Sequence, residues 1–83
     1  MEKRMTHVPH ELAEEFPHMQ QEISDLKARD GHFAKLFDEY HTLNRAIHRA
    51  ETNVEPTDDF HMLEMRKKRL QLKDEIAACL TLA

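Results

Sequence analysis

Apolar side chains in the middle of this 83-residue chain recur at alternating intervals of three and four positions. This spacing places them along one side of an α-helix and is typical of the seam of a coiled coil. The stripe predicts a long helix over residues 32–52, with Asn44 and Glu51 at its edge. Its members are Phe33, Leu36, Tyr40, Leu43, Ile47, Ala50 and Val54.

The pattern predicts a second long helix over residues 58–80, in which apolar side chains form two rows instead of one stripe. The first row is Leu63, Leu70 and Ala77, and the second is Met65, Leu72, Ile76 and Cys79. Two apolar rows require two neighbours. One neighbour is the helix over residues 32–52, folded back antiparallel through a loop that contains Pro56.

The segment before residue 30 predicts a shorter helical region over residues 10–28. A proline inside a helix clashes with the preceding turn, so we expect a break or kink at Pro17. This region also has an apolar face, formed by Phe16, Met19, Ile23 and Leu26. Because this region is short and lies between Pro17 and Gly31, we expect a loosely tethered flap. A second chain is then the favoured cover of the second row, which predicts a dimer, and cover by this first helical region is the alternative.

Capping residues set the expected helix boundaries. Gly31 is expected to end the first helical region, and Asp30 to cap the helix that follows. Thr57 is expected to cap the last helix, with Asp58 and Asp59 in its first turn. The sequence therefore predicts an all-α protein with a flexible N-terminus over residues 1–9. One domain over residues 10–83 follows, an antiparallel, coiled-coil-like helical hairpin with a short N-terminal helical segment.

Composition narrows the class of protein. The net charge is −4, which makes no case for nucleic-acid binding by the whole chain. No apolar run approaches the roughly 20 residues of a membrane span, and residues 1–7 lack the apolar stretch of a signal peptide. A single cysteine excludes an internal disulfide. We therefore expect a cytoplasmic protein that does not contact membranes.

Motifs of catalysis are absent from the sequence, which has neither a glycine-rich loop nor a nucleophile motif. We expect no enzymatic activity and no cofactor. Seven histidines raise the question of a metal site. His41 and His48, however, lie about 10.5 Å apart on a straight helix, too far to share one ion. Solvated surface histidines are the favoured interpretation, and a metal carrier is a weaker alternative.

Five basic residues gather between residues 66 and 73, and they are the best functional lead. Four successive positions point to all sides of a helix, which favours ion pairs and solvated surface over one patch. Glu51 is the expected ion-pair partner of Arg66 or Arg69, and Asn44 is also within reach. The candidate interaction surface comprises Met65, Arg66, Lys67, Lys68, Leu72, Lys73 and Ile76.

The favoured function is therefore a protein-protein interaction or self-association module. The alternative is a nucleic-acid accessory factor that uses the basic cluster 66–73, whose affinity would fall steeply with salt.

Several runs of residues resemble the YdcH-like family of small bacterial proteins over about residues 7–80. The runs are HEL at 10–12, EFP at 15–17, HFAKLFDEYH at 32–41, LNRAIHR at 43–49 and KKRLQLKDEI at 67–76. The resemblance implies a helical hairpin in the bacterial cytoplasm with no established activity, and it transfers no catalytic residue. Many members have Asn-Pro where this chain has Asp30-Gly31, which indicates a looser turn here.

Overall fold

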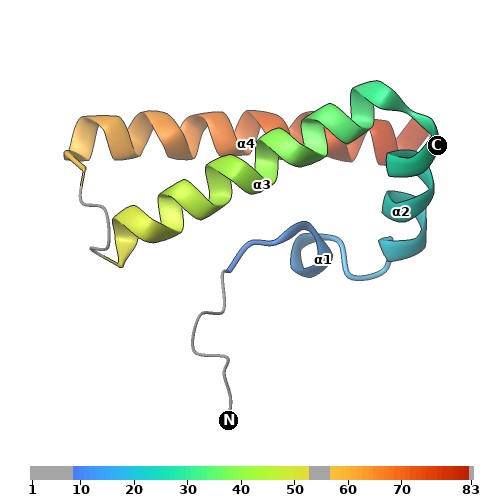
Figure 1. Ribbon diagram of the computed structural model, residues 1–83, viewed down its shortest axis with the longest axis horizontal. Coiled ribbons are helices and arrows are strands. Elements are labelled where there is room, and N and C mark those ends of the chain that lie inside the picture. Colours follow the sequence, from blue (N-terminus) through green and yellow to red (C-terminus); the bar gives the residue numbers. More distant parts are fainter. Residues whose placement is uncertain (1–8, 53–56, 83) are drawn as a thin grey trace, which may run out of the picture.

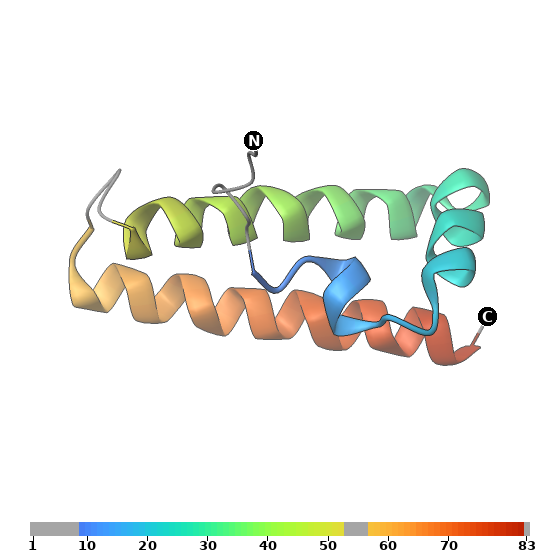
Figure 2. The same ribbon diagram turned by 90° about the horizontal axis from the view of Figure 1, so that it is seen from below.

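The computed structural model describes residues 9–52 and 57–82, which form four helices and no strand. The helices are α1 (Leu12–Glu15), α2 (Gln20–Arg29), α3 (Gly31–Glu51) and α4 (Asp59–Leu82). α3 and α4 run antiparallel along each other, and α2 closes one end of the pair (Figure 1). α1 lies against the middle of the pair (Figure 2). The described part of the chain is therefore all-α and hairpin-like, as the apolar pattern predicts.

The stripe on α3 is the side of that helix that is buried. Phe33, Leu36, Tyr40, Ile47 and Ala50 are buried, whereas Leu43 is half-buried. Asn44, expected at the edge of the stripe, is only 1% exposed and is the buried polar residue of the described chain. Val54, the last predicted member, lies outside the described residues, as does most of the N-terminus expected to be flexible.

The prediction that the second row of α4 faces a second chain is wrong. Leu72 and Ile76 are 2% and 0% exposed and belong to the core of this chain. α1 and α2 supply the missing cover, because Leu12, Ile23 and Leu26 are buried in the same core. The segment expected to be a flap therefore packs on the hairpin. It completes a core that two helices alone would leave open to water.

The helical region expected over residues 10–28 consists of two helices with a break at residues 16–19. Pro17 lies in this break, in agreement with its inability to continue a helix. The break changes the direction of the chain. As a result, α1 lies beside the middle of the hairpin while α2 packs at its end (Figure 1).

Asp30 caps α3 as predicted, because its Oδ1 accepts hydrogen bonds from the backbone N–H groups of His32 and Phe33 at 3.0 and 3.3 Å. Gly31, however, is not a terminator. It is the first residue of α3 and has no positive φ, so α2 ends without a left-handed glycine.

The cap of α4 is Asp58 and not Thr57. Its Oδ1 accepts the backbone N–H of His61 at 2.7 Å, and α4 begins at the next residue. Aspartate is as good a helix cap as threonine, so the sequence alone does not decide between Thr57 and Asp58.

Candidate interaction surface

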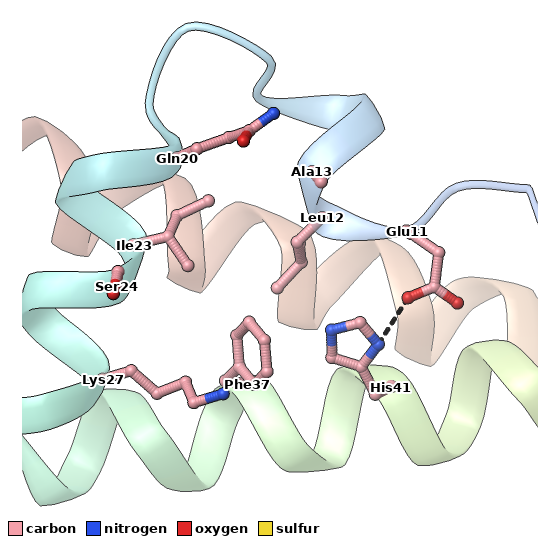
Figure 3. Close-up of a pocket in the computed structure, with 9 residues that line it drawn as sticks. All are labelled: Glu11, Leu12, Ala13, Gln20, Ile23, Ser24, Lys27, Phe37 and His41. Carbon is pink, nitrogen blue, oxygen red and sulfur yellow. Dashed lines mark ion pairs between the residues drawn. The ribbon is translucent and has the colours of Figure 1, made fainter.

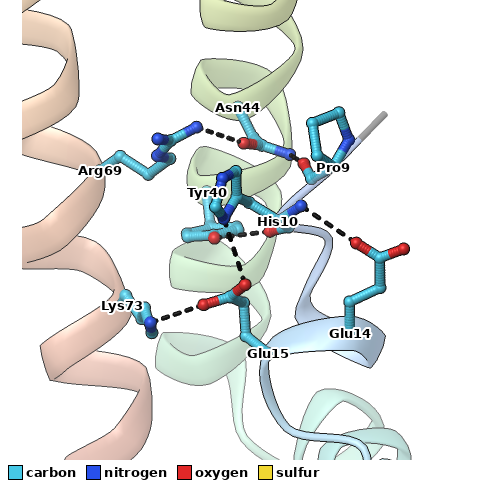
Figure 4. Close-up of polar contacts among 8 residues, drawn as sticks. All are labelled: Pro9, His10, Glu14, Glu15, Tyr40, Asn44, Arg69 and Lys73. Carbon is cyan, nitrogen blue, oxygen red and sulfur yellow. Dashed lines mark hydrogen bonds and ion pairs between the residues drawn. The ribbon is translucent and has the colours of Figure 1, made fainter. Parts of the chain in front are cut away.

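The N-terminal segment is attached to the hairpin through backbone carbonyls as well as side chains. We call residues 9–16 the clasp. Tyr40 donates its hydroxyl to the carbonyl of His10 at 2.6 Å, and Asn44 donates its Nδ2 to the carbonyl of Pro9 at 2.9 Å (Figure 4). Tyr40 and Asn44 lie one turn apart on α3, so they meet two successive carbonyls. His10 has a φ of 65°, a left-handed conformation that histidine adopts more often than most residues.

Asn44 also connects the clasp to α4. Its Oδ1 accepts a hydrogen bond from Nη1 of Arg69 at 2.9 Å. One buried amide therefore joins the clasp, α3 and α4. This agrees with the rule that buried polar groups find hydrogen-bond partners. Of the two partners expected for Arg69, the structure has Asn44 and not Glu51.

Glu15 forms the second link between the clasp and α4. Its Oε1 lies 2.5 Å from Nζ of Lys73, and its Oε2 lies 3.2 Å from Nδ1 of His10. The hydrogen bond from Lys73 lowers the pKa of Glu15, with a smaller contribution from His10. Lys73, expected on an interaction surface, is therefore engaged within its own chain. Burial raises the pKa of Tyr40 to about 12, so the phenol keeps its proton and remains a donor.

The predicted ion pair across the hairpin is present between Glu51 and Arg66. Oε2 of Glu51 and Nη2 of Arg66 are 2.8 Å apart. The two side chains are 34% and 50% exposed, so water screens the pair. The pair therefore contributes little to the stability of the hairpin.

A pocket of about 290 Å³ lies between the clasp, α2 and α3. Phe37 and Ile23 supply apolar walls, and Nζ of Lys27 sits 4.2 Å from the centre of the Phe37 ring (Figure 3). At one side, Nδ1 of His41 lies 2.6 Å from Oε1 of Glu11. Nδ1 of His41 has no hydrogen-bond partner among the described residues, so the contact is an ion pair when the imidazole is protonated. Two charged side chains of the pocket, Glu11 and Lys27, therefore contact other residues of its lining.

His41 differs from the solvated histidine expected from the sequence, because its side chain is only 18% exposed and its ring packs on Phe37 with centroids 4.4 Å apart. Among residues 9–52 and 57–82, no group of three or more histidine, cysteine or acidic side chains is close enough to hold a metal ion. Cys79 is half-buried against the core, as its place in the second row of α4 indicates.

Large apolar side chains remain in water along α4. Phe60, Leu63 and Leu70 are 72%, 55% and 57% exposed. They lie on the side of α4 that faces away from Leu72 and Ile76, and we call these three residues the outer row. Isolated apolar side chains are ordinary on protein surfaces, whereas a row of them along one helix is a candidate contact surface.

The outer row replaces much of the surface predicted from the sequence. Leu72 and Ile76 are buried and Met65 is half-buried, while Arg66 and Lys73 form ion pairs within the chain. Lys67 and Lys68 are exposed, as predicted. Leu63 and Leu70 belong to the first apolar row of the sequence, whereas the predicted interaction surface used the second row. Phe60, which precedes Leu63 by three positions, is the signal that this row extends along the helix.

Residues 33–80 match a family model described as "Protein of unknown function (DUF465)". The chain belongs to this family. Similar proteins include the "Uncharacterized protein YdcH" of Escherichia coli (strain K12) and that of Shigella flexneri, each 36% identical over 61 residues. Each match covers 74% of this chain and 82% of the relative. No solved structure matches. The family match covers most of α3 and α4 but not the clasp or α2.

None of the helices in the described part of the chain is both long enough and apolar enough to cross a membrane.

Proposed function

We propose that this member of the family is a non-enzymatic module of the bacterial cytoplasm that binds a protein surface through the outer row of α4. The observation that carries the proposal is the exposure of Phe60, Leu63 and Leu70 along one helix. A helix whose apolar face lies in water gains free energy when a complementary surface removes that face from water.

The polar side chains of the clasp and the pocket have structural roles. Glu15, Asn44 and Arg69 hold the clasp and the helices together. In the pocket beside the clasp, Glu11 faces His41, and Lys27 covers Phe37. These side chains stabilise the fold, and each has a partner within the chain. This arrangement supports a binding role instead of a catalytic one.

Nucleic-acid binding by the cluster 66–73 has less support. Arg66 and Lys73 are each paired with a carboxylate, and Arg69 is bound to Asn44. Lys67 and Lys68 are the remaining basic residues of the cluster. Two exposed lysines release too few counterions for firm binding to a phosphate backbone at physiological salt.

Photocrosslinking at single sites in the native cells tests the proposal. A photoreactive phenylalanine analogue replaces Phe60 in one variant and Arg45, an exposed residue of α3, in the control. We expect crosslinked protein from position 60 and none from position 45. Leu63→Glu with Leu70→Glu should abolish the product while circular dichroism reports unchanged helix content. Equal products from both positions, or no product from position 60, would refute the proposal.

A further inference from the structure

We propose that the surface that covers the outer row is the outer row of a second copy. The two α4 helices then lie antiparallel, with a twofold axis passing beside Leu70. This inference rests on the proposed function and names its partner. Three features of α4 carry it: the position of Leu70 in the helix, the order of charges along it, and the sizes of the side chains that would face each other.

Leu70 lies at the midpoint of α4, which runs from Asp59 to Leu82. A twofold axis at this point overlaps the two helices over their full length, about 36 Å at 1.5 Å per residue. Leu63 of one copy then faces Ala77 of the other, because both are seven positions from the axis. A large side chain meets a small one, which lets the helices approach closely. Phe60 falls near Leu82 of the second copy, and Leu82 is 87% exposed in this chain.

Charge along α4 changes sign across the midpoint. Residues 59–69 carry four basic and two acidic side chains, a balance of +2, whereas residues 71–82 carry Lys73, Asp74 and Glu75, a balance of −1. An antiparallel pair brings the basic half of one copy to the acidic half of the other. Lys67, which is exposed on the outer side of α4, falls opposite Asp74 of the second copy, and the pair occurs twice by symmetry. A parallel pair would set the basic segments against each other.

The arrangement leaves the fold of each copy intact. Leu72 and Ile76 stay in the core on the opposite side of α4, and Lys73 stays with Glu15 of its own clasp. Binding therefore needs no rearrangement of the fold.

Cysteine crosslinking in purified protein tests the register. In a Cys79→Ser background, Leu70→Cys places two thiols beside the axis, whereas Leu63→Cys places the same pair about 21 Å apart. Under a glutathione redox buffer we expect Leu70→Cys to form at least about five times more covalent dimer than Leu63→Cys. An equal mixture of the Leu63→Cys and Ala77→Cys proteins should form the mixed dimer. The same yield at 63 and 70, or none at 70 in folded protein, would overturn the proposal.

Charge reversal tests the orientation without new cysteines. Lys67→Glu and Asp74→Lys each put like charges across the interface, so sedimentation equilibrium should show the dissociation constant rising about 3- to 10-fold. The two substitutions together restore opposite charges and should return the constant to within about twofold of its starting value. Additive weakening in the double variant would exclude the antiparallel pair.

The two proposals can fail separately. A chain that stays monomeric at high micromolar concentration would overturn the second-copy inference. The proposed function would survive that result if photocrosslinking at position 60 yields a different protein. If position 60 yields nothing in cells, the proposed function fails whatever the purified chain does.

Discussion

At the scale of single residues, two side chains of α3 connect parts of the chain that lie far apart in the sequence. Tyr40 and the carbonyl of His10 are 30 positions apart, and Asn44 and that of Pro9 are 35 apart. Both donors are buried to 1% exposure, so each hydrogen bond is shielded from water on the donor side. A buried donor that loses its acceptor retains the full desolvation cost, which makes these positions sensitive to substitution.

Tyr40→Phe removes one of these hydrogen bonds while keeping the ring in the core. We expect the free energy of unfolding at neutral pH to fall by about 0.5–1.5 kcal/mol, the usual net value of such a bond. Urea denaturation followed by circular dichroism measures the change. Unchanged stability would mean that the hydrogen bond from the hydroxyl to the carbonyl of His10 is no more favourable than the hydrogen bond to water in the unfolded chain.

The same variant should reverse the order of stability at alkaline pH. The pKa of Tyr40 is raised from 10.0 to about 12 in the folded protein. Its contribution is therefore complete below pH 10 and is lost as the pH rises through about 12, by about 2–3 kcal/mol. Tyr40→Phe lacks this loss. Because Tyr40 is the only tyrosine, the ultraviolet absorbance of tyrosinate reports its titration directly. A folded-state pKa near 10 would contradict the expected shift.

At the scale of elements, the stripe on α3 separates fully buried from half-buried positions. Ile47 is 0% exposed, whereas Leu43 lies at the margin of the core. Ile47→Ala should lower the free energy of unfolding by about 2–4 kcal/mol, and Leu43→Ala by about half as much, because less apolar surface leaves the core. Chemical denaturation of the two variants gives the comparison. Equal losses would show that the two positions are buried alike.

The first residue of α3 offers a stabilising change. Gly31 stands where proline is favoured, and a Cβ built there meets no atom within 4 Å. Asp30, with φ −127° and ψ 104°, already has a conformation suited to a residue before proline. Gly31→Pro should therefore raise the free energy of unfolding by about 0.4–1 kcal/mol, because proline reduces the conformational entropy of the unfolded chain. Gly31→Ala is the control, since it adds a Cβ without the proline ring. Loss of stability in both variants would refute this account.

The buried side of a helix could be predicted from the sequence where the helix has one apolar side, as α3 does. It could not be predicted for α4, which has apolar residues on several sides. The spacing of Phe33, Tyr40 and Ile47 identified both α3 and its buried side. α4 carries apolar residues on opposite sides, so a helical projection shows two rows without saying which one meets α3. Tertiary packing decides that question, and it selected Leu72 and Ile76. Glu51 and Arg66 were predictable because both flank the turn of an antiparallel hairpin.

At the scale of the whole molecule, the clasp turns a two-helix hairpin into a closed core. It inserts Leu12 beside α3 and α4 and fixes that residue with polar links on both sides. The carbonyl acceptors themselves could not be predicted, because backbone acceptors leave no side-chain signature. A tyrosine and an asparagine one turn apart within an apolar stripe were the available clue, since buried polar groups need partners.

Glu15 should make the attachment of the clasp sensitive to acid. Its folded-state pKa is lowered from 4.5, so its contribution is complete above pH 4.5 and is lost as the pH falls through the folded-state pKa. Lys73 is 38% exposed, and solvent screening limits the effect to about 0.5–1 kcal/mol. Glu15→Gln should lower the stability at pH 7 by this amount and flatten its decline below pH 4.5. Parallel pH profiles for the two proteins would contradict this role.

The use of main-chain acceptors in the clasp also bears on how such a chain can diverge. Every residue carries a carbonyl, so positions 9 and 10 can exchange side chains without losing the contacts, provided that position 10 tolerates a left-handed backbone. The donors have no such freedom, because few side chains offer a phenol or an amide at that reach. Substitutions should therefore accumulate quickly at positions 9 and 10 and slowly at Tyr40 and Asn44. In related chains, the donor residues should be retained while the residues that supply the carbonyl acceptors vary.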